Sequence, residues 1–105
     1  MVQYPIDVAS GAVEALELET IQARLHALDH PIRLRILRSL LRGAQTTGEL
    51  GDSWQLTAPE ISRHLAVMRA AKLVTTQRRG RYVEYQLEVD PIGRLGTDLV
   101  EALLR

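Results

Sequence analysis

The sequence predicts a mostly helical domain that contains one small β-hairpin. Three observations carry this prediction: apolar residues recur at helical spacing over most of the chain, two capping boxes mark helix starts, and only residues 73–87 alternate with a period of two. The predicted order is four helices, the hairpin and a fifth helix. A chain of 105 residues suits one domain with a modest core. We expect that domain at 13–105, after a candidate flexible segment at 1–12.

The first predicted helix covers about 13–28, with acidic residues between its apolar positions. Its apolar stripe is formed by Leu18, Ile21, Leu25 and Leu28. Asp29 is the candidate N-cap of the second helix, because Asp is a preferred N-cap residue. Pro31 would then lie in the first turn, where proline is tolerated. This helix is expected to end around Gly43.

Two capping boxes then define a pair of helices. Thr46 with Glu49 predicts the start of a short third helix. After a tight turn, Thr57 with Glu60 predicts the start of the fourth. Pro59 is therefore the second residue of the fourth helix, where its missing N–H would have had no intrahelical partner. The proline marks a helix start and does not interrupt a helix.

The segments LVTTQR and YVEYQL, separated by RGR, predict a hairpin with Gly80 in its turn. One face of the second strand is expected to hold Val83, Tyr85 and Leu87. Asp90 and Pro91 are then the expected cap of a single last helix. Its apolar stripe is formed by Ile92, Leu95, Leu99 and Leu103.

The fourth helix, at 58–70, has two different faces. At about 100° per residue, Ile61, Leu65 and Met68 fall in one narrow sector, which we expect to be buried, with His64 beside it. The opposite face holds Pro59, Ser62, Arg63, Ala66 and Ala70. A small, polar face with one arginine suits close approach to a nucleic-acid groove, and the alternative is an ordinary solvated face.

The net charge of zero hides an uneven distribution. Residues 33–81 hold ten basic and three acidic side chains, a balance of +7, whereas 1–32 has a balance of −4 and 82–105 a balance of −3. Twelve of the thirteen basic residues are arginine, which suits bidentate contacts to phosphate and guanine. An anionic partner is therefore expected at the central segment.

These features combine into a winged helix-turn-helix. The third helix, the turn and the fourth helix form the helix-turn-helix, and the basic hairpin follows at the distance expected of a wing. The motifs LDHPIRLRILRSLL, TGEL, LTAPEISRHLAVMRAAKLV and RRGRYVEYQL resemble the ArsR/SmtB-type family of bacterial winged-helix repressors over about 25–88. The resemblance implies a homodimeric repressor that dimerises through its first and last helices. It also implies that helix 58–70 enters the major groove and that the hairpin reaches the flanking minor groove or backbone.

The chain departs from the family members that sense metals. Thr46 and Gly48 stand where such members carry a Cys-x-Cys pair, and the chain has no cysteine, which excludes thiol and persulfide sensing. Asp98 and Glu101 lie on the last helix, where other members bind metal, but no histidine follows His64, so we expect this acidic pair to be solvated surface.

Other site chemistries are also disfavoured. His26, Asp29 and His30 could form only a weak accidental metal site. Ser62 and His64 lie on different faces of one helix, and the chain has no glycine-rich phosphate loop or paired-carboxylate cleft, so no enzyme is expected. No metal and no cofactor are predicted, and an effector stays unknown. The N-terminal sequence lacks a secretory signal and no apolar run could span a membrane, so we expect a cytoplasmic protein.

The main hypothesis is a sequence-specific, DNA-binding regulator that acts as a homodimer on double-stranded DNA. The candidate DNA-binding residues are Thr57, Ala58, Pro59, Ser62, Arg63, Arg69, Arg78, Arg79 and Arg81. The candidate dimer interface is Leu18, Ile21, Leu25, Ile92, Leu95, Leu99 and Leu103. Lys72 is expected to add nonspecific attraction, and at least some arginines of the second helix to be solvated. The alternative is a winged helix used as a protein-interaction or dimerisation module.

Overall fold

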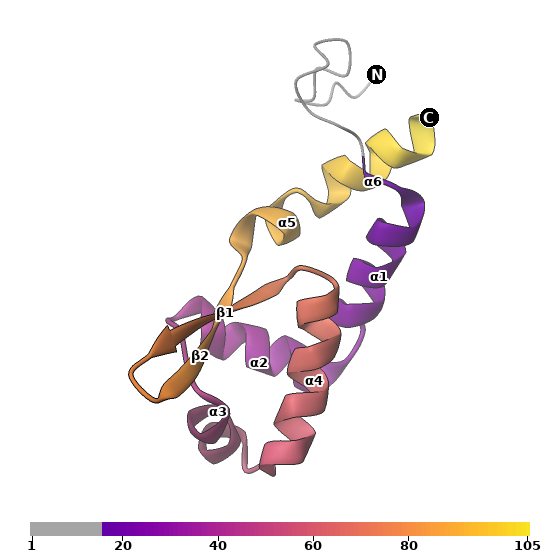
Figure 1. Cartoon of the computed structure of the whole chain (residues 1–105). Coiled ribbons are helices and arrows are strands. Elements are labelled where there is room, and N and C mark those ends of the chain that lie inside the picture. Colours follow the sequence, from indigo (N-terminus) through magenta and orange to yellow (C-terminus); the bar gives the residue numbers. More distant parts are fainter. Residues whose placement is uncertain (1–15) are drawn as a thin grey trace.

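The computed structural model describes residues 16–105, and its elements follow the predicted order with one addition (Figure 1). The helices and strands are α1 (Leu18–Leu28), α2 (Pro31–Leu41), α3 (Thr47–Trp54), α4 (Ala58–Ala70), β1 (Val74–Arg79), β2 (Tyr82–Leu87), α5 (Val89–Gly93) and α6 (Leu95–Leu104). The predicted segment 1–12 and the expected helical residues 13–15 lie outside the described residues. Within 16–105, no helix is long and apolar enough to cross a membrane.

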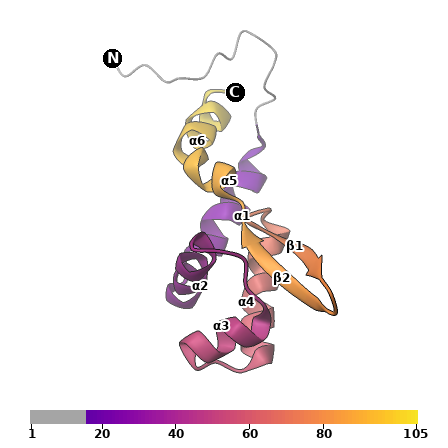
Figure 2. The ribbon, with the colours of Figure 1, turned by 90° about the vertical axis from the view of Figure 1, so that its left-hand side faces the viewer.

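The elements form two ends of an elongated molecule (Figures 1 and 2). The helices α2, α3 and α4 and the hairpin make the lower end, while α1 and α6 lie side by side toward the upper end. The core lies in the lower end, where the inward faces of the helices meet. Its largest fully buried side chains include Ile36, Leu50, Ile61, Leu65, Met68, Leu73 and Val74. This confirms the predicted buried sector of α4.

The start of α2 differs from the prediction by one residue. The N-cap is His30, whose Nδ1 accepts a hydrogen bond from the Ile32 backbone N–H at 3.1 Å. Asp29 instead ends α1, because its own N–H donates to the His26 carbonyl oxygen. Pro31 is the first helical residue. Proline fits this position because a backbone N–H there would have no intrahelical partner.

The single last helix that the sequence predicts is two helices. The α5 and α6 helices are separated at Arg94, which has φ −95° and ψ 1° and ends the regular turn. Gly93 and Gly96 flank this residue, and glycine is the least favourable residue for a helix interior after proline. The N-cap of α5 is Glu88, and neither α5 nor α6 has a side-chain cap, so the expected cap by Asp90 and Pro91 is also wrong.

The hairpin is antiparallel, with Val74 opposite Leu87 and Arg79 opposite Tyr82. Gly80 takes φ 63° in the turn, as predicted. Of the expected apolar face, Tyr85 and Leu87 pack against the core, but Val83 is exposed near the tip. Glu84, on the other face, is buried.

A short additional bridge fixes the hairpin to the helices. Tyr85 exchanges two backbone hydrogen bonds with Gln45, which precedes α3, with N···O distances of 2.7 and 3.0 Å. The orientation of the wing is therefore tied to the start of the helix-turn-helix.

Candidate nucleic-acid interface

The turn between α3 and α4 is tight for an identifiable steric reason. Gln55 takes the left-handed conformation with φ 56° and ends α3. Leu56 then folds back, and its N–H donates to the Gly51 carbonyl oxygen at 3.0 Å. A Cβ on Gly51 would lie 2.8 Å from the Leu56 carbonyl oxygen. Glycine at position 51 therefore allows the close approach that sets the angle between α3 and α4.

Both predicted capping boxes are present. In α3, Glu49 N–H donates to Thr46 Oγ1 and Thr46 N–H donates to a Glu49 carboxylate oxygen. In α4, Glu60 N–H donates to Thr57 Oγ1 at 3.3 Å and Thr57 N–H donates to Glu60 Oε2 at 2.9 Å. Because Thr57 Oγ1 is the acceptor in its box, the hydroxyl hydrogen stays free to donate to an anion at the helix start.

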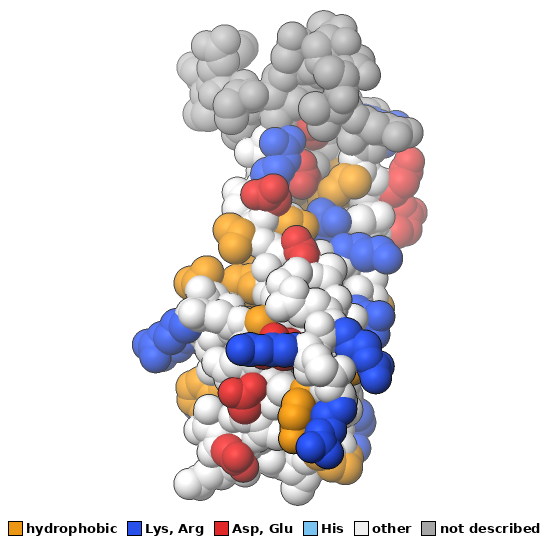
Figure 3. All heavy atoms as spheres, turned by 60° about the vertical axis from the view of Figure 1, so that its left-hand side comes forward, with side chains coloured by type: hydrophobic (Ala, Val, Ile, Leu, Met, Phe, Trp, Pro, Cys, Tyr) orange, Lys and Arg blue, Asp and Glu red, His pale blue; other side chains and the backbone are white. Residues whose placement is uncertain are grey.

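The outer face of α4 is accessible along its whole length. The predicted contact residues on α4 are all exposed: Ala58, Pro59, Ser62, Arg63 and Arg69. Ala66 and Ala70 continue the same face and are also exposed. The face therefore has the small, polar character that its sequence predicts. Most Lys and Arg side chains in Figure 3 lie along one side and the lower half of the molecule.

The three hairpin arginines are exposed but not equivalent. Arg79 Nη1 lies 3.4 Å from Glu84 Oε2, and the Glu84 side chain is 9% exposed, so this cation already has a partner. Arg78 is paired with Val83 in the ladder and therefore shares the face of Tyr85, on the opposite side from Arg79. Arg81 lies in the turn, with its guanidinium carbon 5.8 Å from the Tyr82 ring centroid.

The inward side of α4 is connected to α1 and α2 by one arginine. Arg33 is buried, and it donates from Nε to the Ala27 carbonyl oxygen at 2.7 Å and from Nη2 to the His26 carbonyl oxygen at 3.0 Å. Its Nη1 lies 3.5 Å from His64 Nδ1 on α4. Arg33 therefore joins the end of α1 to the middle of α4 and is not a solvated residue of the second helix.

The surroundings of His64 favour its neutral form. Burial is the largest cause that lowers the pKa of the His64 imidazole below its ordinary value of 6.5. Electrostatic interactions with His30, Arg33 and Arg63 lower this pKa further, while the interaction with Glu60 raises it. The His30 ring packs against the His64 ring with a centroid distance of 4.6 Å. A neutral Nδ1 is also what the contact with Arg33 requires.

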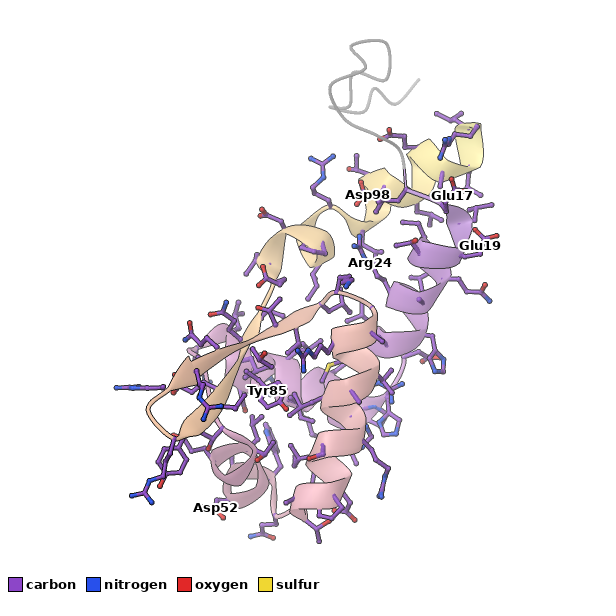
Figure 4. The ribbon with its side chains drawn as sticks, viewed as in Figure 1. Glu17, Glu19, Arg24, Asp52, Tyr85 and Asp98 are labelled. Atoms are coloured by element: carbon purple, nitrogen blue, oxygen red, sulfur yellow. The ribbon has the colours of Figure 1, made fainter. Side chains whose placement is uncertain are left out.

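The α1 and α6 helices meet around a buried ion pair, which corrects the expectation of a solvated acidic pair. Asp98 and Glu101 are only 7% and 3% exposed. Arg24 Nη1 lies 3.9 Å from Asp98 Oδ2, and Arg94 Nε lies 3.7 Å from Asp98 Oδ1. Arg24 and Asp98 point toward each other between the two helices in Figure 4. Arg24 Nε also donates to the Ala71 carbonyl oxygen at 3.2 Å, which connects this pair to the end of α4.

The predicted dimer residues fall into three groups by exposure. Leu18, Leu25 and Leu103 are exposed at 48%, 44% and 64%. Ile92, Leu95 and Leu99 are half-buried. Ile21 is buried within the chain itself, so it supports α1 from inside and does not face a partner. The three exposed leucines remain available for contact with a second copy.

No cluster of metal ligands occurs among the described residues, taking three or more His, Cys, Asp or Glu side chains as a cluster. His30 Nδ1 is used as the cap of α2, while Ser62 is exposed on α4 and His64 faces inward. Within 16–105, no serine–histidine arrangement for nucleophilic catalysis is formed at this helix.

Comparison with known proteins places these features in one family. The family model described as bacterial regulatory protein, arsR family, matches residues 30–76. The biofilm growth-associated repressor of Agrobacterium fabrum is 31% identical over 103 residues, which cover 96% of this chain and 85% of the relative. The chain belongs to the ArsR family of bacterial regulatory proteins. It is therefore a helix-turn-helix transcriptional regulator and not an enzyme.

Further relatives agree with this ArsR-family assignment. The HTH-type transcriptional regulator CmtR of Mycobacterium tuberculosis is 38% identical over 87 residues, which cover 82% of this chain and 74% of that protein. The crystal structure of NolR from Sinorhizobium fredii superposes with a TM-score of 0.68 at 28% identity, over 94% of this chain and 95% of that one. The winged helix-turn-helix predicted from the sequence is thus confirmed.

This ArsR-family chain uses residues that the sequence pattern did not reveal. The role of Arg33 could not be predicted, because an arginine in a basic helix reads as solvated. The Gln45 bridge and the burial of Glu84 have no local signal, because both depend on contacts distant in sequence.

Proposed function

We propose that this regulator represses transcription as a homodimer that binds a palindromic operator. In each protomer, α4 lies in the major groove and the hairpin contacts the flanking minor groove or backbone. The observation that carries the proposal is the outer face of α4, which is small and polar and includes Arg63. Two copies related by a twofold axis would place two such helices on half-sites about 34–36 Å apart, one turn of DNA.

Roles for single residues follow from their positions. Arg63 and Ser62 contact base edges or phosphates from the middle of α4, and Ala58 and Pro59 pack close to the groove. Thr57 donates its hydroxyl hydrogen to a phosphate at the helix N-terminus, where backbone N–H groups also point outward. The hairpin arginines and Arg69 bind backbone phosphates.

The dimer is proposed to form through α1 and α6. Exposed leucines on both helices support it, because apolar side chains exposed at the end of a small domain mark a contact surface. A cytoplasmic location is consistent with action on the chromosome. The chain has no cysteine for thiol sensing, and we propose no metal and no cofactor, so the effector stays undefined.

Selection from a genomic fragment library tests the proposal. The purified protein is mixed with sheared DNA, and retained fragments are sequenced and footprinted. We expect one or a few sites with an inverted repeat whose half-sites lie about one helical turn apart. Retention of DNA without sequence preference, or no retention at low salt, would favour the protein-interaction alternative.

A further inference from the structure

Lys72 has a backbone conformation that its side chain does not favour. It takes φ 64°, in the left-handed region, directly after α4. The N–H of Leu73 donates to the Met68 carbonyl oxygen at 2.9 Å, and the N–H of Lys72 donates to the Arg69 carbonyl oxygen at 3.0 Å. These two bonds form a Schellman motif, in which the left-handed position is usually glycine. A lysine there is strained, because its Cβ approaches the backbone.

The fold gains no visible contact from this lysine. Its side chain is exposed, and it makes no hydrogen bond or ion pair with the rest of 16–105. Glycine would form the same two backbone bonds without strain. A strained residue whose side chain supports nothing inside the chain points to a role outside it.

The surroundings of Lys72 indicate that role. A surface hollow of about 400 Å³ lies between α4 and the hairpin and is lined by Ser62, Ala66, Arg69, Ala70, Lys72 and Tyr85. The outer face of α4 contributes small residues to this lining, and β2 contributes Tyr85, which is labelled in Figure 4. The two cations of the hollow, Arg69 and Lys72, lie at the end where α4 leads into β1. The hollow is therefore continuous with the proposed DNA-reading face.

The geometry of DNA indicates that a sugar–phosphate strand occupies this hollow. A sugar–phosphate strand separates each major groove from the adjacent minor groove. If α4 occupies the major groove and the hairpin reaches the flanking minor groove, one strand must pass between them, over this hollow. Its phosphates would then lie beside Arg69 and Lys72, and phosphate contacts of this kind fix the position of a protein on DNA.

We propose that the hollow between α4 and the hairpin binds a phosphate of the DNA backbone. Lys72 supplies a positive charge to this phosphate, and this role accounts for a lysine in a strained backbone position. This inference rests on the proposed DNA-binding function. It assigns to Lys72 a defined contact, beyond general attraction. The contact is independent of base sequence, so it orients α4 and does not read the operator.

Three substitutions at one position separate strain from charge. Lys72→Gly removes both, Lys72→Ala removes the charge and keeps the strain, and Lys72→Arg keeps both. Arg38→Gln is the matched control, because it removes one exposed positive charge from α2, outside the hollow. Binding to operator and to random DNA is measured by fluorescence anisotropy at several salt concentrations, and stability is measured by thermal unfolding.

We expect Lys72→Gly and Lys72→Ala to lose about fivefold in affinity at 0.15 M salt on both DNAs and to lower the salt slope by about one unit per protomer, which is about two units for the proposed dimer, because each protomer loses one phosphate contact. Lys72→Arg should bind like the wild type, and Arg38→Gln should leave the slope nearly unchanged. Lys72→Gly should unfold about 4–8 °C above Lys72→Ala, because only glycine relieves the strain.

Two results would overturn the inference while leaving the proposed function intact. One is a Lys72→Gly protein that is more stable yet binds both DNAs like the wild type. The other is an equal loss of slope in Arg38→Gln, which would show long-range attraction without a seated phosphate. A wild-type protein that binds no DNA would instead overturn the proposed function and this inference with it.

Discussion

Arg24 and Asp98 form an ion pair buried between α1 and α6, with 3.9 Å between Nη1 and Oδ2 and only 10% of each side chain exposed. The same guanidinium donates to the Ala71 carbonyl oxygen at the end of α4. One side chain therefore connects the proposed dimer helices to the proposed reading helix. A shift of α1 against α6 would therefore change the hydrogen bond of Arg24 at the carboxyl end of α4.

Replacing Arg24 by methionine should destabilise the protein by about 1–3 kcal/mol, because the buried Asp98 side chain then keeps only Arg94, which is half-exposed, as a partner. The Arg24→Met, Asp98→Leu double variant should recover part of that loss, because it buries no unpaired charge. Urea unfolding at one protein concentration measures both, since the proposed dimerisation would make stability depend on concentration. Equal losses in the single and double variants would show that the Ala71 contact dominates.

The two glycines of α3 should respond to alanine in opposite directions. Gly51→Ala should cost about 1–3 kcal/mol, because the new Cβ would lie 2.8 Å from the Leu56 carbonyl oxygen. Gly48→Ala should stabilise by up to about 1 kcal/mol, because its Cβ meets only Thr46 Oγ1, at 3.8 Å, and alanine favours the helix. Denaturant midpoints of the two variants decide this. A neutral Gly51→Ala would mean that the turn can open without cost.

The free energy of unfolding should decrease as the pH is lowered below about 6.5, and His64 should account for part of this decrease. Its folded pKa is lowered, mainly by burial, so the unfolded chain binds the proton more tightly. The contribution of neutral His64 is therefore complete above its unfolded pKa of about 6.5 and is lost as the pH falls toward the folded value. Unfolding free energies from pH 7.5 to 5 should decline less steeply in His64→Gln, which keeps His26 and His30. Parallel declines would contradict the prediction.

Leu103→Glu should convert the proposed dimer to monomer, because a charge would replace an apolar side chain that is 64% exposed in the isolated chain. Leu41→Glu is a matched control, because Leu41 is 66% exposed but lies on α2. Sedimentation at micromolar concentration should show a monomer only for Leu103→Glu, with weakened operator binding, because two half-sites are read together. A monomeric wild type would remove the basis of the prediction.

Substitutions should distinguish arginines that recognise bases from arginines that bind backbone phosphates. If Arg63 makes a bidentate contact to guanine, Arg63→Ala should cost about 1–3 kcal/mol on the operator and little on random DNA. Arg81→Ala should weaken binding to both DNAs and lower the salt slope by about one unit per protomer, which is about two units for the proposed dimer. Arg79→Ala should have a smaller effect, because Arg79 already pairs with Glu84.

Salt titrations of the three variants on both DNAs provide the measurement. Equal weakening of operator and random DNA by Arg63→Ala would place sequence reading elsewhere, for example in wing arginines that enter a narrow minor groove. No change in any of the three variants would favour the protein-interaction alternative.

The sequence by itself determined the features that depend on neighbours close along the chain. The capping boxes join residues three positions apart, the apolar sector of α4 follows from helical spacing, and the hairpin turn follows from Gly80 between two alternating segments. Each of these is local, so its residues meet whatever the rest of the chain does. They were enough to predict the winged helix-turn-helix and the exposed face of α4.

Only the tertiary structure decided which charged side chains are buried. Arg24, Arg33, Glu84, Asp98 and Glu101 read as surface residues in the sequence, yet all are buried. Their burial is set by helices and strands that pack from distant parts of the chain. Arg24 and Asp98 pair across α1 and α6, whereas Glu101 Oε1 is buried without a hydrogen-bond partner among the described residues.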